Sequence, residues 1–113
     1  MSQLPSVMNA TIDDAKIIQY LLNSAHSSAS AGKANFFMSF GFSQANWAEL
    51  KKSLLEHPQT NQVTNQTTTA FGDKYVISCS LTTPDGRNPC VISVWIIESP
   101  DPNPKFVTAY PDP

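Results

Sequence analysis

Apolar residues recur at helical spacing near the start of the chain and predict a helix over residues 10–26. The apolar face of this helix consists of Ile17, Ile18, Leu21 and Leu22. Thr11 is expected to cap the helix start, because Asp14 follows three residues later as in a capping box. The first element of the protein is therefore expected to be an amphipathic helix.

Two further helices are predicted before residue 60. The small polar stretch SSASAG, residues 27–32, is expected to form a loop. After it, the phenylalanines of KANFFMSFGF lie on a short helix that Gly41 stops. A third helix is expected to start at Ser43 and to end at Pro58, with a buried stripe formed by Trp47, Leu50, Leu54 and Leu55.

The periodicity changes in the second half of the chain. Residues 59–70 are polar, uncharged and rich in Thr, Gln and Asn, which fits either an extended loop or a weak edge strand. Two β-rich runs flank the turn sequence PDGRN, residues 84–88, and predict a hairpin. The run KFVTAYP, residues 105–111, predicts a last strand.

Strict alternation along that last strand has a consequence for its polar side chains. Phe106, Thr108 and Tyr110 are expected to share one face, with Val107 and Ala109 on the other. Two hydroxyl groups would then lie on the same side of the sheet.

Helices followed by strands predict an α+β fold. We expect a single domain over residues 1–113, with two or three helices packed on one face of a three- to four-stranded antiparallel sheet. The other face would be open, and a functional site can be built there.

Charge and hydropathy narrow the range of partners. The 113 residues carry a net charge of -2, with a pI near 5.5. Proteins that bind phosphates are usually basic, so a nucleic-acid role would need a local cationic patch or a neutralising partner. No apolar run approaches the ~20 residues of a membrane span, and the N-terminal sequence does not resemble a secretory signal. A cytoplasmic protein is expected.

The two cysteines flank the predicted turn. Cys79 and Cys90 would face each other across the hairpin, either as packed thiols or as a disulfide. No spacing of metal ligands is present, and neither a cofactor nor a metal is expected.

The polar residues have both structural and functional interpretations. Lys74 is either a solvated edge charge or a cation on the open sheet face. Arg87 is either a turn residue or a phosphate ligand. His26 either caps the first helix or, together with Lys33, performs acid–base chemistry. His57 suits the negative end of the third helix.

A series of short motifs resembles a small bacterial domain family of unknown function. In chain order these are LLNSAH, GKANFF, FGDKY, PDGR, VWII and KFVTAYP. The resemblance covers about residues 4–111. In layout the family is similar to the toxin ribonucleases that include barnase, RelE and EndoU, whose helices pack on an antiparallel sheet with catalytic groups on its exposed face.

This resemblance implies metal-independent RNA cleavage and assigns provisional roles. His26 or Lys33 would act as acid or base, and Lys74 and Arg87 would hold the phosphate. Thr108 and Tyr110 would position the phosphate or relay protons. The chain departs from the family pattern at Asp73 and at SSASAG, and both departures lower the local positive potential.

Two functions from different classes follow. The first is a toxin-like ribonuclease of a toxin–antitoxin or polymorphic toxin system, whose partners are RNA and a small antitoxin or immunity protein. The alternative is a non-catalytic protein-binding module, such as an adaptor or an immunity or defence-associated protein. The acidic pI favours the alternative, whereas the polar residues at the strand ends favour the ribonuclease.

Overall fold

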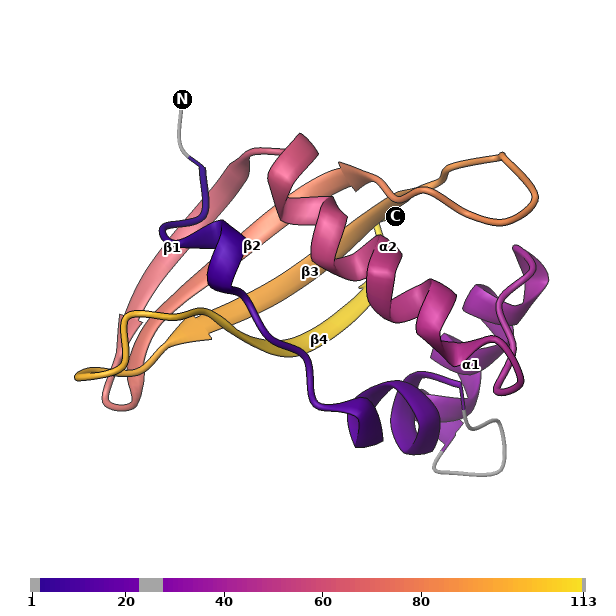
Figure 1. The fold of residues 1–113 in the computed structure, drawn as a ribbon, viewed down its shortest axis with the longest axis horizontal. Coiled ribbons are helices and arrows are strands. Elements are labelled where there is room, and N and C mark those ends of the chain that lie inside the picture. The colour runs from indigo at the N-terminus through magenta and orange to yellow at the C-terminus, as the bar shows by residue number, and fades with distance from the viewer. Residues whose placement is uncertain (1–2, 23–27, 113) are drawn as a thin grey trace.

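The fold is α+β, as the sequence predicts, with a four-stranded antiparallel sheet of order β1-β2-β3-β4. The computed structural model describes residues 3–22 and 28–112. The strands are β1 (Val63–Thr69), β2 (Gly72–Ser80), β3 (Cys90–Ile97) and β4 (Lys105–Pro111). The helix α2 (Trp47–Thr60) lies across one face of the sheet, and the N-terminal segment passes beside β4 (Figure 1).

The first helix begins later than the hydrophobic pattern predicts, and residues 23–26 of that prediction lie outside the described residues. Thr11 does not cap it, because the backbone of Thr11 is extended and forms a parallel bridge with Lys105 of β4. The side chain of Asp13 caps the turn instead and accepts a 3.0 Å hydrogen bond from the N–H of Ala15. The helix continues as a π-helix, η2 (Lys16–Leu21), which buries Ile17, Leu21 and the following Leu22.

The loop prediction for SSASAG is wrong over residues 28–32. These residues form the start of α1 (Ser28–Ser39), which packs against η2 and β4. Ser and Ala are tolerated in a helix once tertiary contacts stabilise it, so local composition was a poor guide here. The end of α1 agrees with the prediction, because Gly41 has a φ of 105° that favours glycine.

The helix α2 begins later than predicted, at Trp47 instead of Ser43, and it extends beyond its predicted end. Ser43 and Asn46 form reciprocal hydrogen bonds just before it, from Ser43 N to Asn46 Oδ1 at 2.6 Å and from Asn46 N to Ser43 Oγ at 3.3 Å. Pro58 lies within the last turn, where it removes only its own amide from the hydrogen-bond ladder, and the helix continues to Thr60.

The core lies between the helices and the inner face of the sheet, which we define as the face that packs against α2. Trp95 of β3 is fully buried there and packs edge-on against Phe106, with ring centroids 5.4 Å apart and an interplanar angle of 74°. The main large buried side chains from the helical half are Ile17, Leu21, Phe37, Phe42, Leu50 and Leu54.

A β-bulge in β4 overturns the predicted alternation. Thr108 pairs with Val94, whereas Phe106 pairs with the next residue of β3, Trp95, so Val107 is an extra residue between the two pairs. The bulge turns Phe106 to the inner face, where only 4% of it is exposed. Phe106 therefore does not share a face with Thr108 and Tyr110.

Candidate functional site

The face of the sheet opposite α2, which we call the outer face, carries the polar residues that the sequence singles out in the strands. Register and alternation place on it, among others, three residues of each of the strands β2, β3 and β4. They are Lys74, Val76, Ser78, Ile92, Val94, Ile96, Lys105, Thr108 and Tyr110.

The outer face is ordered in rows that run across the strands. Tyr110 lies opposite Ile92, and Ile92 lies opposite Ser78. Thr108 occupies the next row, opposite Val94. The centre of the face is thus aliphatic, and hydroxyl groups flank it on both sides.

The bulge gives Thr108 and Tyr110 a different neighbour from the expected one. Lys105 pairs with Ile96, which lies on the same side of β3 as Val94, so the outer side of β4 carries Lys105, Thr108 and Tyr110. Alternation predicts Phe106 beside the two hydroxyl groups, but the structure has the cation of Lys105 on that side. Thr108 and Tyr110 are both half-buried, and both take part in interactions within the protein.

Lys74 lies at the same end of the sheet as Lys105. The two residues occupy one row, with Ile96 between them, because Lys74 and Lys105 are both register partners of Ile96. Neighbouring strands are ~4.8 Å apart, so the two backbones are about 10 Å apart. Two lysine side chains of this length can reach a common polyanion on the outer face.

Arg87 is not brought together with Lys74. It follows β2 in the loop to β3, and the strand from Lys74 to Ser80 alone spans about 20 Å at ~3.3 Å per residue. The expectation that Lys74 and Arg87 hold one phosphate does not fit this separation.

The contacts of Arg87 are within the protein. Its guanidinium group donates hydrogen bonds to the carboxylate of Asp85 and to the carbonyl of Ser39, and it lies 4.2 Å from the ring centroid of Phe40. The N–H of Asp85 also donates to the carbonyl of Phe40 at 3.3 Å. Arg87 thus joins the β2–β3 loop to the end of α1.

The two remaining predicted residues precede the strands. His26 lies outside the described residues. Lys33 lies in α1, the helix that packs against β4, and nothing is described of its side chain.

His57 has a different role from the one that its position at a helix end predicts. Its Nε2 lies 2.8 Å from the carbonyl oxygen of Cys79, and its Nδ1 lies 2.8 Å from Oγ of Ser93. Trp95 Nε1 in turn donates to the same Oγ at 2.9 Å. Only 1% of His57 is exposed, and this burial lowers its pKa, although the hydrogen bond to Cys79 opposes the shift.

Sequence spacing contains a signal for this histidine. Leu50, Leu54 and His57 follow one another at helical intervals of four and three, and all three are buried. A histidine on the apolar side of a helix indicates a buried, hydrogen-bonded ring. No such signal exists for Lys105, because the bulge that turns it outward cannot be read from the sequence.

The cysteines are neighbours on β2 and β3 and carry free thiols. A hydrogen bond with the Cys79 side chain, burial and the carboxylate of Asp112 together raise the pKa of Cys90 to about 12. Cys79 is exposed and has a φ of 151°, and its carbonyl oxygen lies 2.8 Å from Nε2 of His57.

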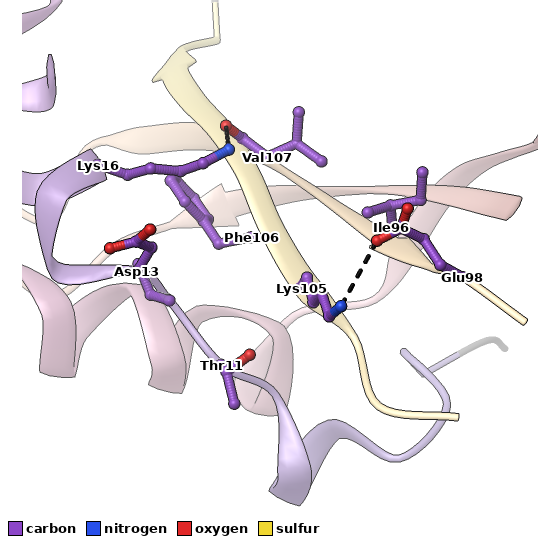
Figure 2. Close-up of a pocket in the computed structure, with 9 residues that line it drawn as sticks. Thr11, Asp13, Lys16, Ile96, Glu98, Lys105, Phe106 and Val107 are labelled. Atoms are coloured by element: carbon purple, nitrogen blue, oxygen red, sulfur yellow. Dashed lines mark hydrogen bonds and ion pairs between the residues drawn. The ribbon is translucent and has the colours of Figure 1, made fainter. Parts of the chain in front are cut away.

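A cavity with a volume of about 400 Å³ lies at the edge of β4, beside the outer face (Figure 2). Its polar walls come from Asp13 and Lys16 of the N-terminal segment and from Glu98 and Lys105. Lys16 Nζ donates to the carbonyl of Val107, the bulged residue, at 3.2 Å. Within residues 3–22 and 28–112, no group of three or more His, Cys, Asp or Glu is placed to hold a metal ion.

No helix in the described part of the chain is both long and apolar enough to cross a membrane. This finding concerns residues 3–22 and 28–112 alone.

A family model described as "Domain of unknown function (DUF6883)" matches residues 3–113. No protein with a curated description matches the sequence. A similar solved structure is that of a contact-dependent growth inhibition toxin–immunity protein complex from Klebsiella pneumoniae 342. The similarity covers 96% of this chain and 97% of that chain at a TM-score of 0.73 and 16% identity, which establishes a shared fold.

Proposed function

The chain belongs to the DUF6883 family of domains of unknown function, and we propose that it is a toxin-like, metal-independent ribonuclease that acts at the outer face of its sheet. The observation that carries this proposal is the position of Thr108 and Tyr110 on that face, with Lys74 in the row next to that of Thr108. A cation beside two hydroxyl groups suits a phosphodiester, because the cation stabilises negative charge and the hydroxyls orient the phosphate oxygens.

The reaction would be an internal transphosphorylation. The ribose 2′-oxygen attacks the neighbouring phosphorus and loses its proton to a general base, while the 5′-oxygen leaves with a proton from a general acid. The products are a 2′,3′-cyclic phosphate and a 5′-hydroxyl, so the reaction consumes no water and needs no co-reactant. Lys74 would stabilise the charge of the phosphorane, and Thr108 and Tyr110 would orient the phosphate or relay the proton.

The acid and base come from the segment before the sheet in this proposal. His26 and Lys33 are the assigned pair on sequence grounds alone. Arg87 is left out of the phosphate site because its guanidinium already joins Asp85 to the end of α1.

Induced expression in a bacterial host tests the proposal. Wild-type protein should arrest growth and fragment RNA, and the double variant Lys33→Ala, Tyr110→Phe should do neither. Tyr75→Phe is the matched control, since Tyr75 is a buried inner-face tyrosine whose hydroxyl contacts Gln66. Purified protein should cleave RNA in excess EDTA and leave cyclic phosphate ends. Intact RNA with folded, soluble wild-type protein would overturn the proposal.

A second candidate is a non-catalytic protein that binds a toxin. It is favoured by the net charge of -2 and by β1, an exposed edge strand whose sequence VTNQTTT contains no charged residue. Such an edge can accept a strand from a partner, because its outward N–H and C=O groups have no pairing strand. The similar solved structure contains a toxin and its immunity protein, so it includes both a toxin and a protein that binds one.

The same expression experiment separates the two candidates. A binding module would leave growth and RNA unchanged and would protect cells from the toxin it recognises. Thr67→Lys on β1 would then abolish protection, because a lysine on an edge strand opposes strand addition. Loss of toxicity in Tyr110→Phe would contradict this second candidate.

A further inference from the structure

The cavity at the edge of β4 adjoins the proposed phosphate site. One wall is Ile96, which pairs with Lys105 on the outer face, and the opposite wall is the segment from Thr11 to Lys16 (Figure 2). Thr108 pairs with Val94 and Lys105 pairs with Ile96, two residues further along β3, so the bulge leaves the backbones of Lys105 and Thr108 about 7 Å from each other. This is the length scale of one nucleotide, so an RNA strand whose phosphate lies at Thr108 extends into the cavity.

We propose that this cavity binds a nucleotide adjacent to the cleaved one, with Lys105 and Lys16 at its phosphate and Glu98 at its base. This inference rests on the proposed ribonuclease function and specifies how the same face holds its substrate. A volume of about 400 Å³ lies within the range of pockets that bind small molecules.

The two lysines are disposed differently toward such a ligand. Lys16 Nζ is fixed by its 3.2 Å bond to the carbonyl of Val107, and an ammonium group has three donors, so two remain for a phosphate. Lys105 Nζ lies 3.6 Å from Glu98 and 3.8 Å from Asp101, outside hydrogen-bond distance. Its side chain is half exposed, and such surface ion pairs exchange readily because they contribute little stability.

Glu98 supplies a hydrogen-bond acceptor for a base, which a cavity lined only by lysines would lack. A carboxylate repels a phosphate but accepts hydrogen bonds from the amino and imino groups of a base. When Lys105 turns to the phosphate, the carboxylate of Glu98 is left without its cation and gains a partner in the base. The cavity therefore separates the two functions, with lysines for the backbone and a glutamate for the base.

Binding of a fluorescein-labelled single-stranded RNA 12-mer, containing all four bases, tests the inference by anisotropy. The measurements are made in the Tyr110→Phe background with EDTA, so that the RNA stays intact. Lys105→Gln should weaken binding about five- to tenfold and reduce the slope of log K against log salt by about one. Lys105→Arg should restore both, and Lys52→Gln, an exposed lysine of α2, should change neither.

Glu98→Gln should act differently from Lys105→Gln. Homopolymeric 12-mers of the four bases should bind the parent protein with unequal affinities, and Glu98→Gln should level those differences without changing the salt slope. In cleavage-competent protein, Lys105→Gln should raise KM and leave kcat within twofold.

The outcomes distinguish this inference from the proposed function. If the wild type cleaves RNA and neither Lys105→Gln nor Glu98→Gln changes RNA affinity or KM, the nucleotide site is wrong and the proposed ribonuclease function is retained. Lys105-dependent binding without cleavage by the wild type would overturn the ribonuclease and leave the site standing. Absence of RNA binding by the folded protein would overturn both.

Discussion

Nδ1 of the buried His57 lies 2.8 Å from Oγ of Ser93 and must accept its hydrogen bond. The carbonyl of Cys79 can only accept, so Nε2 carries the ring proton and Nδ1 of the neutral ring has none to donate. The hydroxyl of Ser93 therefore donates to His57, and its oxygen accepts from Trp95 Nε1. The hydroxyl group of Ser93 thus forms a hydrogen bond with His57 of α2 and another with Trp95 of β3.

Stability should fall as the pH drops below about 6.5. Burial lowers the pKa of His57 in the folded state, so below the ordinary pKa the unfolded chain binds a proton that the folded chain does not. The stabilisation is present above pH 6.5 and is lost progressively as the pH falls towards the lowered value. Urea unfolding between pH 7.5 and 5.5 measures it, over a range in which carboxylates with ordinary pKa values stay ionised.

The matched variants identify the histidine responsible. His57→Gln should flatten the pH dependence, whereas His26→Gln, which changes the other histidine of the chain, should preserve it. An equal slope in the wild type and in His57→Gln would show that the burial of His57 is not its source.

Ser93→Ala should destabilise the protein by about 2–6 kcal/mol. Removal of the hydroxyl leaves two buried groups, Nδ1 of His57 and Nε1 of Trp95, without a partner, at about 1–3 kcal/mol each. Ser78→Ala is the control, because Ser78 lies on the outer face and its contact with Thr64 is exposed; it should cost less than about 0.5 kcal/mol. Equal denaturation midpoints for the two variants would contradict the network.

Arg87→Gln should slightly lower the midpoint of thermal unfolding and, under the proposed ribonuclease function, leave RNA cleavage per folded molecule unchanged. The variant loses the charged contact with Asp85 and the cation over Phe40, both on an exposed loop. Thermal unfolding and initial cleavage rates measure the two effects. A hundredfold fall in kcat at unchanged stability would show instead that Arg87 is a phosphate ligand.

Cys90 should react slowly with iodoacetamide at pH 8. Its pKa of about 12 leaves almost no thiolate, which is the nucleophilic form. Mass spectrometry of alkylated peptides should find Cys79, which is exposed, modified well before Cys90. In 8 M urea the two rates should converge, and preferential modification of Cys90 in the folded protein would contradict the assignment.

The sequence was sufficient for the elements with strong periodicity. The hairpin β2–β3, the last strand and the buried stripe of α2 follow from alternation and helical spacing, because each buries one face of its own element. It was insufficient where tertiary contacts decide the local structure. The parallel bridge from Thr11 to Lys105 delayed the start of the first helix, and the packing of α1 made residues 28–32 helical.

The candidate site was predictable to a similar degree. Thr108 and Tyr110 share a face, as alternation predicts, but the bulge at Val107 replaces Phe106 with Lys105 beside them. A bulge arises from how two strands pair, and a single strand's sequence does not record it. The separation of Lys74 from Arg87 follows from strand length, which makes the two ends of a hairpin remote from each other.

The bridge between Thr11 and Lys105 also sets an order of events during synthesis. A ribosome makes Thr11 long before Lys105, so the N-terminal segment has no strand to pair with until nearly the whole domain has emerged. Contacts between residues this distant in sequence form late, because loop closure precedes them. The outer face, completed by Thr108 and Tyr110, is therefore assembled only after β4 has been synthesised.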